Sequence, residues 1–193
     1  MSLLLVLDEE SPSRVILRTS EPMEITERLN ARGLRFERWR AARPLPAGAG
    51  EPEVLEAYAT DVERIRREGG YTKVDVVRLS PAPEDPAWPE RARAARAKFL
   101  DEHTHAEDEI RFFVEGTGLF YLRLPDAVHL VLCEQGDLLS VPAGTRHWFD
   151  MGTSPRFCAI RFFRTPEGWV GHFTGDRIAA RFPSFDEVAG TRP

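Results

Sequence analysis

Four side chains have the types and spacing of ligands to a transition-metal ion: His103, His105, Glu109 and His147. In an extended segment, residues two apart point to the same face, so His103 and His105 can offer two imidazoles to one ion. Imidazole suits Fe, Ni, Cu and Zn. Glu109 lies six residues after His103, roughly 20 Å away in a straight strand. Because a ligand bond is only about 2.0–2.2 Å long, the chain must turn at residues 106–108 to bring Glu109 back.

The residues around these ligands match two spaced motifs. The first, His-x-His-x3-Glu-x6-Gly, spans residues 103–116. The second, Gly-x5-Pro-x-Gly-x2-His, is formed by Gly136, Pro142, Gly144 and His147. Together they resemble the paired motifs of the cupin superfamily, which implies a β-barrel or jelly-roll fold. Two positions depart from that pattern, with Ala97 in place of a glycine and Met151 in place of an asparagine, and neither is a ligand.

Within that superfamily, residues 99–118 and 142–150 resemble the signature of the acireductone dioxygenase family. The similarity extends over most of the chain in length and order and includes Gly168 and Trp169. It implies an enzyme of methionine salvage that cleaves 1,2-dihydroxy-3-keto-5-methylthiopentene with O2, using one Fe(II) or Ni(II) per chain. With Fe(II) the products would be 4-methylthio-2-oxobutanoate and formate. With Ni(II) they would be 3-methylthiopropionate, formate and carbon monoxide. Which metal is bound in the cell stays open, since affinity at such sites rises from Fe to Ni and supply decides.

Two arginines are candidates for binding the substrate. Arg111 lies two residues beyond Glu109 on the same strand face, so it is expected to point into the cavity beside the metal. A buried arginine needs a partner, which favours contact with an anionic substrate; the alternative is a salt bridge to Glu115 or to another structural acid. Arg161 alternates with Phe162 in the last predicted strand. It is the second candidate because its side chain can also face the inside of the barrel.

The remaining site residues come from the resemblance. Phe99, Phe149 and Trp169 match positions that line the family's pocket, where an apolar wall suits a methylthio tail, although aromatic residues in a barrel also form plain core. Glu102 and Asp108 flank the ligands and are expected to orient them as hydrogen-bond acceptors, with solvation as the alternative. Outside the motifs, His129 lies in an apolar strand and is predicted to be a core histidine with its hydrogen bonds satisfied.

The hydrophobic pattern predicts a mainly β fold, a cupin-type barrel with a few peripheral helices. Helices are expected near residues 22–32, 54–65 and 90–100. Strands are expected at 3–7, 14–19, 34–40, 71–79, 109–115, 119–124, 127–133, 138–141, 147–150 and 156–163, with a turn at Gly116-Thr117-Gly118. We predict one domain over residues 1–193. Residues 1–100 form a mixed α/β part packed on the barrel, 101–163 the metal-binding barrel core, and 164–193 a wrapping tail.

Composition narrows the partners. The net charge of −5 and the pI near 5.6 do not indicate a surface that binds nucleic acid. The apolar run at residues 3–7 is too short for a membrane span, and it lacks the basic leader of a signal peptide. Cys133 and Cys158 lie in apolar runs and are expected to be buried free thiols, so the protein is predicted to be cytoplasmic. We expect a monomer with a small-molecule substrate and O2 as partners.

Two other functions fit the same ligands. One is a different cupin enzyme, such as a manganese-dependent oxalate-acting protein or a quercetin-type dioxygenase. The other is a non-catalytic cupin that binds a metal or a small molecule. Loss of a ligand or of Arg111 would favour the second, and the sequence keeps all five residues.

Overall fold

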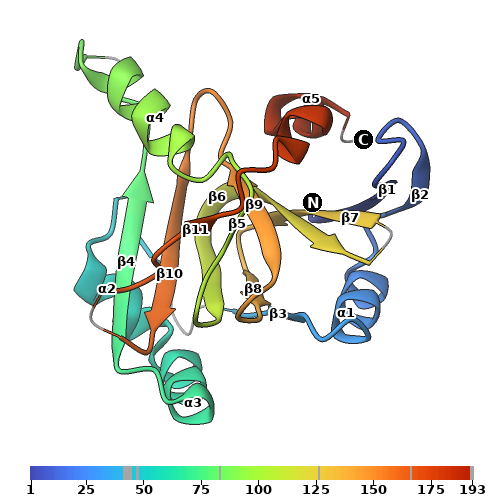
Figure 1. The fold of residues 1–193 in the computed structure, drawn as a ribbon. Coiled ribbons are helices and arrows are strands. Elements are labelled where there is room, and N and C mark those ends of the chain that lie inside the picture. The colour runs from blue at the N-terminus through green and yellow to red at the C-terminus, as the bar shows by residue number, and fades with distance from the viewer. Residues whose placement is uncertain (41–44, 47, 83, 126, 166, 192–193) are drawn as a thin grey trace.

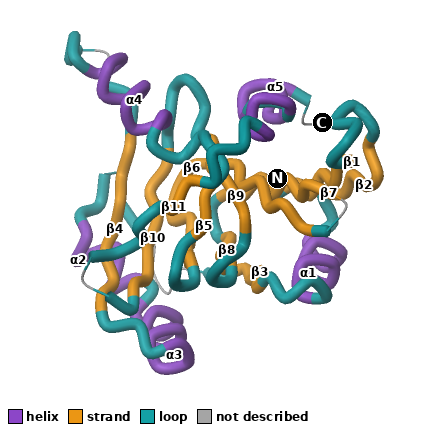
Figure 2. Tube along the Cα trace, viewed as in Figure 1, coloured by secondary structure: helices purple, strands orange, loops and turns teal. Residues whose placement is uncertain are grey.

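The computed structural model describes residues 1–40, 45–46, 48–82, 84–125, 127–165 and 167–191. Within these residues the protein is mainly antiparallel β with peripheral helices, as predicted (Figures 1 and 2). The eleven strands of the described residues are β1 (Leu3–Asp8), β2 (Val15–Thr19), β3 (Arg35–Arg38), β4 (Lys73–Leu79), β5 (His103–Thr104), β6 (Glu109–Leu124), β7 (Ala127–Glu134), β8 (Asp137–Val141), β9 (Arg146–Asp150), β10 (Phe157–Phe163) and β11 (His172–Phe173). Of these, the short β5 and β11 were not predicted.

Strand β6 is the centre of the fold because it belongs to both layers of strands. Its first half pairs with β8 and β10, and its second half pairs with β7 and β9. The prediction of a turn at residues 116–118 was therefore wrong. The strand bends there instead, at Gly116, whose φ of +72° favours glycine and whose close neighbour is the backbone carbonyl of Arg156. The bend carries one continuous strand from one layer to the other.

The first hundred residues contribute strands as well as helices. β1 pairs with β7 and carries β2 on its outer edge, β3 pairs with β8, and β4 pairs with β10. The apolar run predicted at residues 3–7 is buried on both faces, as the continuous hydrophobic sequence of β1 requires. This N-terminal part thus extends the sheets that hold the site.

Helices lie at the periphery of the strands (Figure 2). They are α1 (Pro22–Asn30), α2 (Glu51–Ala57), α3 (Ala59–Gly69), α4 (Trp88–Ala97), a 3-10 turn η1 (Ile178–Arg181) and α5 (Phe185–Gly190). The single helix predicted at residues 54–65 is in fact two, because the backbone leaves the helical region at Tyr58, whose φ is −114°. No helix in the described ranges is long and apolar enough to cross a membrane.

The C-terminal tail packs against the outer face of one layer, as far as it is described; residues 166, 192 and 193 lie outside the described residues. Tyr121 and Trp148 stack in parallel there, with ring centroids 4.8 Å apart. Ile178 and Phe182 of the tail cover them, and the Tyr121 hydroxyl donates to the carbonyl of Pro183 at 2.7 Å. Burial of these side chains holds the tail across β6 and β9, the strands that carry Glu109 and His147.

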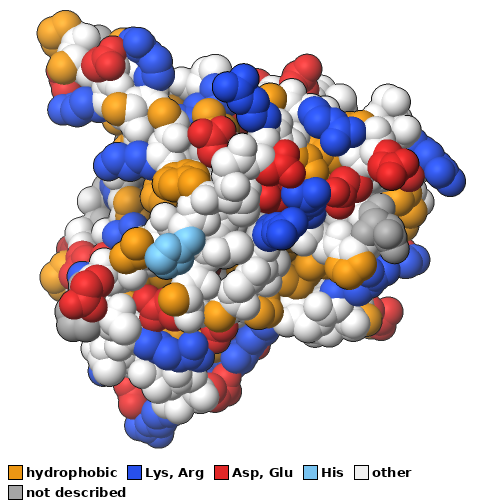
Figure 3. Space-filling view, in the orientation of Figure 1, with side chains coloured by type: hydrophobic (Ala, Val, Ile, Leu, Met, Phe, Trp, Pro, Cys, Tyr) orange, Lys and Arg blue, Asp and Glu red, His pale blue; other side chains and the backbone are white. Residues whose placement is uncertain are grey.

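Charged side chains of both signs intermingle over the face seen in Figure 3. Many of the arginines are paired with acids. Arg123, for example, contacts the carboxylates of Glu9, Glu102 and Asp176. The high arginine content is thus used largely in ion pairs that link segments distant in sequence.

One buried ion pair predicts a measurable pH dependence of stability. Asp150, only 2% exposed, accepts from Arg96 Nε at 2.6 Å and Nη2 at 2.8 Å and from the backbone N–H groups of Gly152 and Phe185. Burial alone would raise the pKa of Asp150, but Arg96 and these hydrogen bonds lower it below 3.8. The charged Asp150 carboxylate therefore stabilises the fold fully only above about pH 4, and this stabilisation is lost as the pH falls through the lowered pKa of Asp150.

Replacing Asp150 with asparagine is accordingly expected to lower the free energy of unfolding by about 3 kcal/mol at pH 7. The difference between wild type and variant should shrink toward pH 3, as urea denaturation at several pH values would measure. Glu90→Gln is the matched control, since Glu90 pairs with Arg93 on the exposed surface of α4 and should matter little. A difference that stays constant from pH 7 to pH 3 would contradict the assignment.

Candidate metal centre

Three elements bring the four predicted ligands together. β5 carries His103, which pairs in register with His147 of β9, and Glu109 opens β6. His105 lies on the short connection between β5 and β6. One ligand atom from each of the four residues lies within 4.8 Å of the others, and all four residues are 4% exposed or less. The predicted turn at residues 106–108 is present, since β5 ends at residue 104 and β6 begins at 109.

Backbone carbonyls set the orientation of all three imidazoles. Each Nδ1 lies 2.8 Å from a carbonyl oxygen; the pairs are His103 with Asp101, His105 with Val170, and His147 with Thr145. A carbonyl only accepts hydrogen bonds, so each Nδ1 must carry the proton and each Nε2 presents a lone pair. Neutral rings of this tautomer are the form that binds metal ions.

The carboxylate of Glu109 faces the same point as these lone pairs. Its Oε2 lies 3.2 Å from His105 Nε2 and 3.1 Å from His147 Nε2. Carboxylate oxygens and unprotonated imidazole nitrogens repel one another unless a cation lies between them. The arrangement therefore fits a metal ion, and His105 Nε2 is a buried atom without a hydrogen-bond partner.

The electrostatics also suit a cation. Burial alone would raise the pKa of Glu109, but the positive charge of the neighbouring Arg111 keeps it well below 4.5, so the carboxylate is charged. Burial, followed by the neighbouring His147, lowers the pKa of His103 to about 4 and keeps that ring neutral. Three neutral imidazoles and one carboxylate make a divalent metal site in which the ion keeps a net charge near +1.

Arg111 lies beside the ligands, as expected from its position on the strand. It is 3% exposed, and its Nη2 donates to Glu109 Oε1 at 2.9 Å. The guanidinium carbon stacks 4.3 Å from the centroid of the Phe149 ring, and Nε has no partner. Burial lowers the pKa of Arg111, although Glu109 opposes that shift. The alternative of a salt bridge to an acid of the chain is present, but the partner is Glu109; Glu115 pairs with Arg78 instead.

The three predicted aromatic residues lie around this group. The Phe99 ring is 6.2 Å from His103, and the carbonyl of Phe99 accepts from the N–H of Phe149 at 2.8 Å. Phe149 is 2% exposed and supports Arg111. Trp169 lies 6.3 Å from His105 and 5.5 Å from the guanidinium of Arg111, with its indole Nε1 buried and without a hydrogen-bond partner.

Arg161 is placed differently. It lies opposite Arg111 in the β6–β10 ladder, and its guanidinium is 5.8 Å from the Trp169 ring. Its Nε and Nη2 each donate to a different oxygen of Asp75 at 2.8 Å. The charge of Arg161 is thus already paired by a residue of β4, which the alternation of β10 alone did not reveal.

Glu102 and Asp108 do not contact the histidines, contrary to the expectation that they orient them. Glu102, 1% exposed, accepts from Arg123 at 3.0 Å and from Thr174 Oγ1 at 2.7 Å. Asp108 accepts from Arg164 and from the backbone N–H of Ala143. The carbonyls two residues before His103 and His147 already satisfy those rings, so the two acids hold neighbouring segments instead.

Sequence reasoning missed the contribution of the tail. The carbonyl of Val170 orients His105, and β11 pairs with β5, which brings the Phe173 ring to 5.6 Å from His103. Backbone carbonyls act whatever the side chain is, so no residue type at position 170 could have indicated this contact.

The comparisons with known proteins agree with this geometry. The model of the ARD/ARD′ family matches residues 4–171. The chain belongs to the acireductone dioxygenase family. It is 55% identical to acireductone dioxygenase 1 of Nocardia farcinica, covering 98% of this chain and all of the relative. It is 52% identical to the acireductone dioxygenase of Saccharopolyspora erythraea, with both chains covered in full. The family's enzymes are oxidoreductases of the dioxygenase type.

A solved family structure is also similar. The acireductone dioxygenase of Bacillus anthracis, determined with a cadmium ion in its active centre, superposes with a TM-score of 0.72 at 27% identity. The match covers 90% of this chain and 99% of that one. The predicted cupin-type fold is confirmed by this similarity.

Proposed function

We propose that the chain cleaves acireductone, 1,2-dihydroxy-3-keto-5-methylthiopentene, with O2, using one Fe(II) or Ni(II) ion held by His103, His105, Glu109 and His147. The observation that carries the proposal is the convergence of three imidazole lone pairs and one carboxylate within 4.8 Å in a chain of this family. With Fe(II) the products would be 4-methylthio-2-oxobutanoate and formate. With Ni(II) they would be 3-methylthiopropionate, formate and carbon monoxide.

When bound, the metal supplies a Lewis acid that stabilises the anionic enediol of the substrate. Arg111 is proposed to supply a second fixed positive charge. Stacking on Phe149 and the bond to Glu109 hold its guanidinium in place, so little reorganisation is needed when an anion binds. Its buried, unpartnered Nε is a donor available to the substrate.

Phe99, Phe149 and Trp169 are proposed to form an apolar wall for the methylthio tail and to exclude water. The free indole N–H of Trp169 is a further donor beside the site. Arg161 is proposed to add positive potential without direct contact, because Asp75 already binds its guanidinium. Glu102 is proposed to anchor the tail through Thr174, and Asp108 to anchor the segment before β9 through Ala143.

The proposal extends to the whole chain. Residues 1–193 would act as one domain and as a monomer, with 101–163 holding the metal and 1–100 and 164–193 enclosing it. Cytoplasmic localisation is proposed because Cys133 and Cys158 are both buried and unbonded. The partners would be acireductone and O2, with neither nucleic acid nor membrane involved.

Anaerobic reconstitution tests the function. Metal-free protein would be loaded with Fe(II), mixed with acireductone and then with O2, while the ultraviolet absorbance of the enediol is followed. We expect metal-dependent decay with one formate per substrate, and carbon monoxide only in a parallel sample loaded with Ni(II). Decay equal to that of the metal-free control, with the metal retained, would contradict the proposal and favour an oxalate- or quercetin-type cupin enzyme or a non-catalytic cupin.

A further inference from the structure

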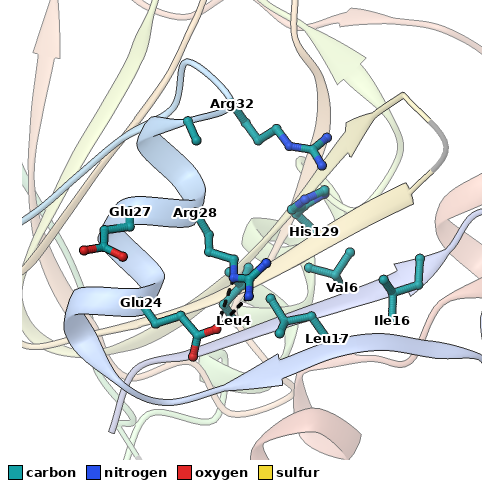
Figure 4. A pocket seen from close by; sticks show the side chains of 10 residues that line it. Leu4, Val6, Ile16, Leu17, Glu24, Glu27, Arg28, Arg32 and His129 are labelled. Carbon is teal, nitrogen blue, oxygen red and sulfur yellow. Dashed lines mark hydrogen bonds and ion pairs between the residues drawn. The ribbon is translucent and has the colours of Figure 1, made fainter.

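A second cavity lies apart from the metal centre, between α1 and the edge of the sheet formed by β1, β2 and β7 (Figure 4). Its volume is about 580 Å3, a size typical of small-molecule sites. The residues that line it belong to none of the strands that carry the metal ligands; they include Leu4, Val6, Ile16, Leu17, Arg28, Arg32 and His129. The cavity is therefore not part of the acireductone site.

His129 is the unexpected residue in this cavity. The prediction that its hydrogen bonds are satisfied was wrong, because it is 5% exposed and its Nδ1 is buried without a partner. It lies on β7, opposite Val6 of β1 and Leu122 of β6, two aliphatic side chains that offer it no acceptor or donor. A buried imidazole nitrogen without a partner costs stability, and a bound water or a ligand at this position would remove that cost.

Two arginines, Arg28 and Arg32, line the same cavity as this histidine. Figure 4 shows Arg28 of α1 and Arg32, in the turn after α1, extending toward the strands, whereas Glu27 points away. Arg28 is neutralised by Glu24 at 3.0 Å. Arg32 forms no ion pair within the described residues, and burial together with Arg32 lowers the pKa of His129 to about 4. At neutral pH the cavity thus presents one unpaired guanidinium next to a neutral imidazole.

The rest of the lining is apolar. Leu4 and Val6 are buried floor residues from β1, and Leu17 lies beside them on β2. Ile16, 53% exposed, flanks the open side. An aliphatic chain laid along Ile16 and Leu17 would cover apolar surface that water now meets, while its polar end would meet Arg32 and His129.

We propose that this cavity binds a monocarboxylate that carries a short unbranched apolar chain. The carboxylate lies between the guanidinium of Arg32 and the imidazole of His129, and the chain lies over Leu4, Val6 and Leu17. Arginine matches a carboxylate with two parallel donors, and a neutral imidazole donates one more hydrogen bond. The same chemistry is shared by fatty acids and, under the function proposed above, by the methylthio keto acid product.

Isothermal titration calorimetry on metal-loaded protein tests the proposal, with hexanoate and 4-methylthio-2-oxobutanoate as separate probes and hexylammonium as the cationic control. We expect at least one acid to bind with millimolar affinity or better, and Arg32→Gln to weaken it about tenfold or more. The preferred acid identifies the source of the ligand. His129→Phe, which keeps the ring and removes both nitrogens, should also weaken binding, and Arg93→Gln on α4 should not.

Three results would overturn the proposal. One is the absence of binding by either acid to folded protein. Another is binding unchanged in Arg32→Gln, which would place the carboxylate at the metal. The third is tighter binding of hexylammonium than of hexanoate, which would mean that Glu24 and Glu27 dominate. Arg32 is exposed, so its variant should fold even if the His129 variant does not. The proposal depends on binding alone, so its failure would leave the dioxygenase assay unaffected.

Discussion

Replacing Glu109 with alanine is expected to abolish turnover and to reduce bound metal from one ion per chain to a small fraction. The substitution removes the only anionic ligand of the group, so a divalent ion would keep its full charge in a buried site. It also leaves Arg111 buried without its ion-pair partner, which should cost about 3–5 kcal/mol of folding free energy. Metal analysis and thermal denaturation measure the two effects separately.

Two further variants sharpen this test. Glu115→Ala changes a glutamate on the same strand that pairs with Arg78 and should keep metal and activity. The double variant Glu109→Ala/Arg111→Met removes the unpaired cation together with the carboxylate. It should recover most of the lost stability while still failing to bind metal. Full metal content and turnover in Glu109→Ala would remove Glu109 from the site.

Replacing Arg111 with methionine is expected to leave the metal bound and to lower kcat/KM by about 10²- to 10³-fold. Methionine matches the length of the aliphatic stem and keeps the packing against Phe149, but it supplies neither charge nor donors. Arg111→Lys keeps the charge without the planar fork and should recover part of the loss. Steady-state kinetics on variants with equal metal content makes the comparison.

Arg161→Gln provides the matched control, because Arg161 lies opposite Arg111 but is bound by Asp75. A loss below about tenfold is expected there, consistent with a role through potential alone. If Arg111→Met kept wild-type kcat/KM, the guanidinium would be structural and the substrate charge would be met elsewhere. Equal losses in both variants would show that the two arginines act together.

Three of the four predicted ligands could be grouped from sequence because they lie close together in the chain. His103, His105 and Glu109 lie within seven residues, and the short length of metal bonds required the turn that the structure contains. The apolar periodicity also placed most strands, since alternation and continuous burial both leave a pattern in the sequence. The grouping of these three residues thus followed from spacing and coordination chemistry, whereas His147 was assigned through the resemblance of its surrounding motif to that of the cupins.

What sequence could not supply depends on contacts between distant segments. Arg161 pairs with Asp75, and the Nδ1 of His105 pairs with the backbone carbonyl of residue 170. In each pair, the sequence around one member contains nothing that indicates the other. A glycine at position 116 fits a turn between two strands as well as a bend inside one strand. The pairing of β6 with β10 before this residue and with β7 after it shows that the strand bends. The unsatisfied nitrogen of His129 likewise depends on which neighbours surround it.

The pairing of β1 has a consequence for how the chain reaches its native state. Leu3 to Leu7 are buried against β7, where Leu3 lies opposite Leu132, so β1 can pair early with β2 but must wait for β7, which is synthesised much later. At ordinary translation speeds that delay is on the order of ten seconds, during which the edge of β1 that pairs with β7 has no native partner. Long-range pairing of this kind slows folding and exposes a segment able to aggregate. Nascent chains of this protein should therefore depend on a chaperone until β7 has emerged.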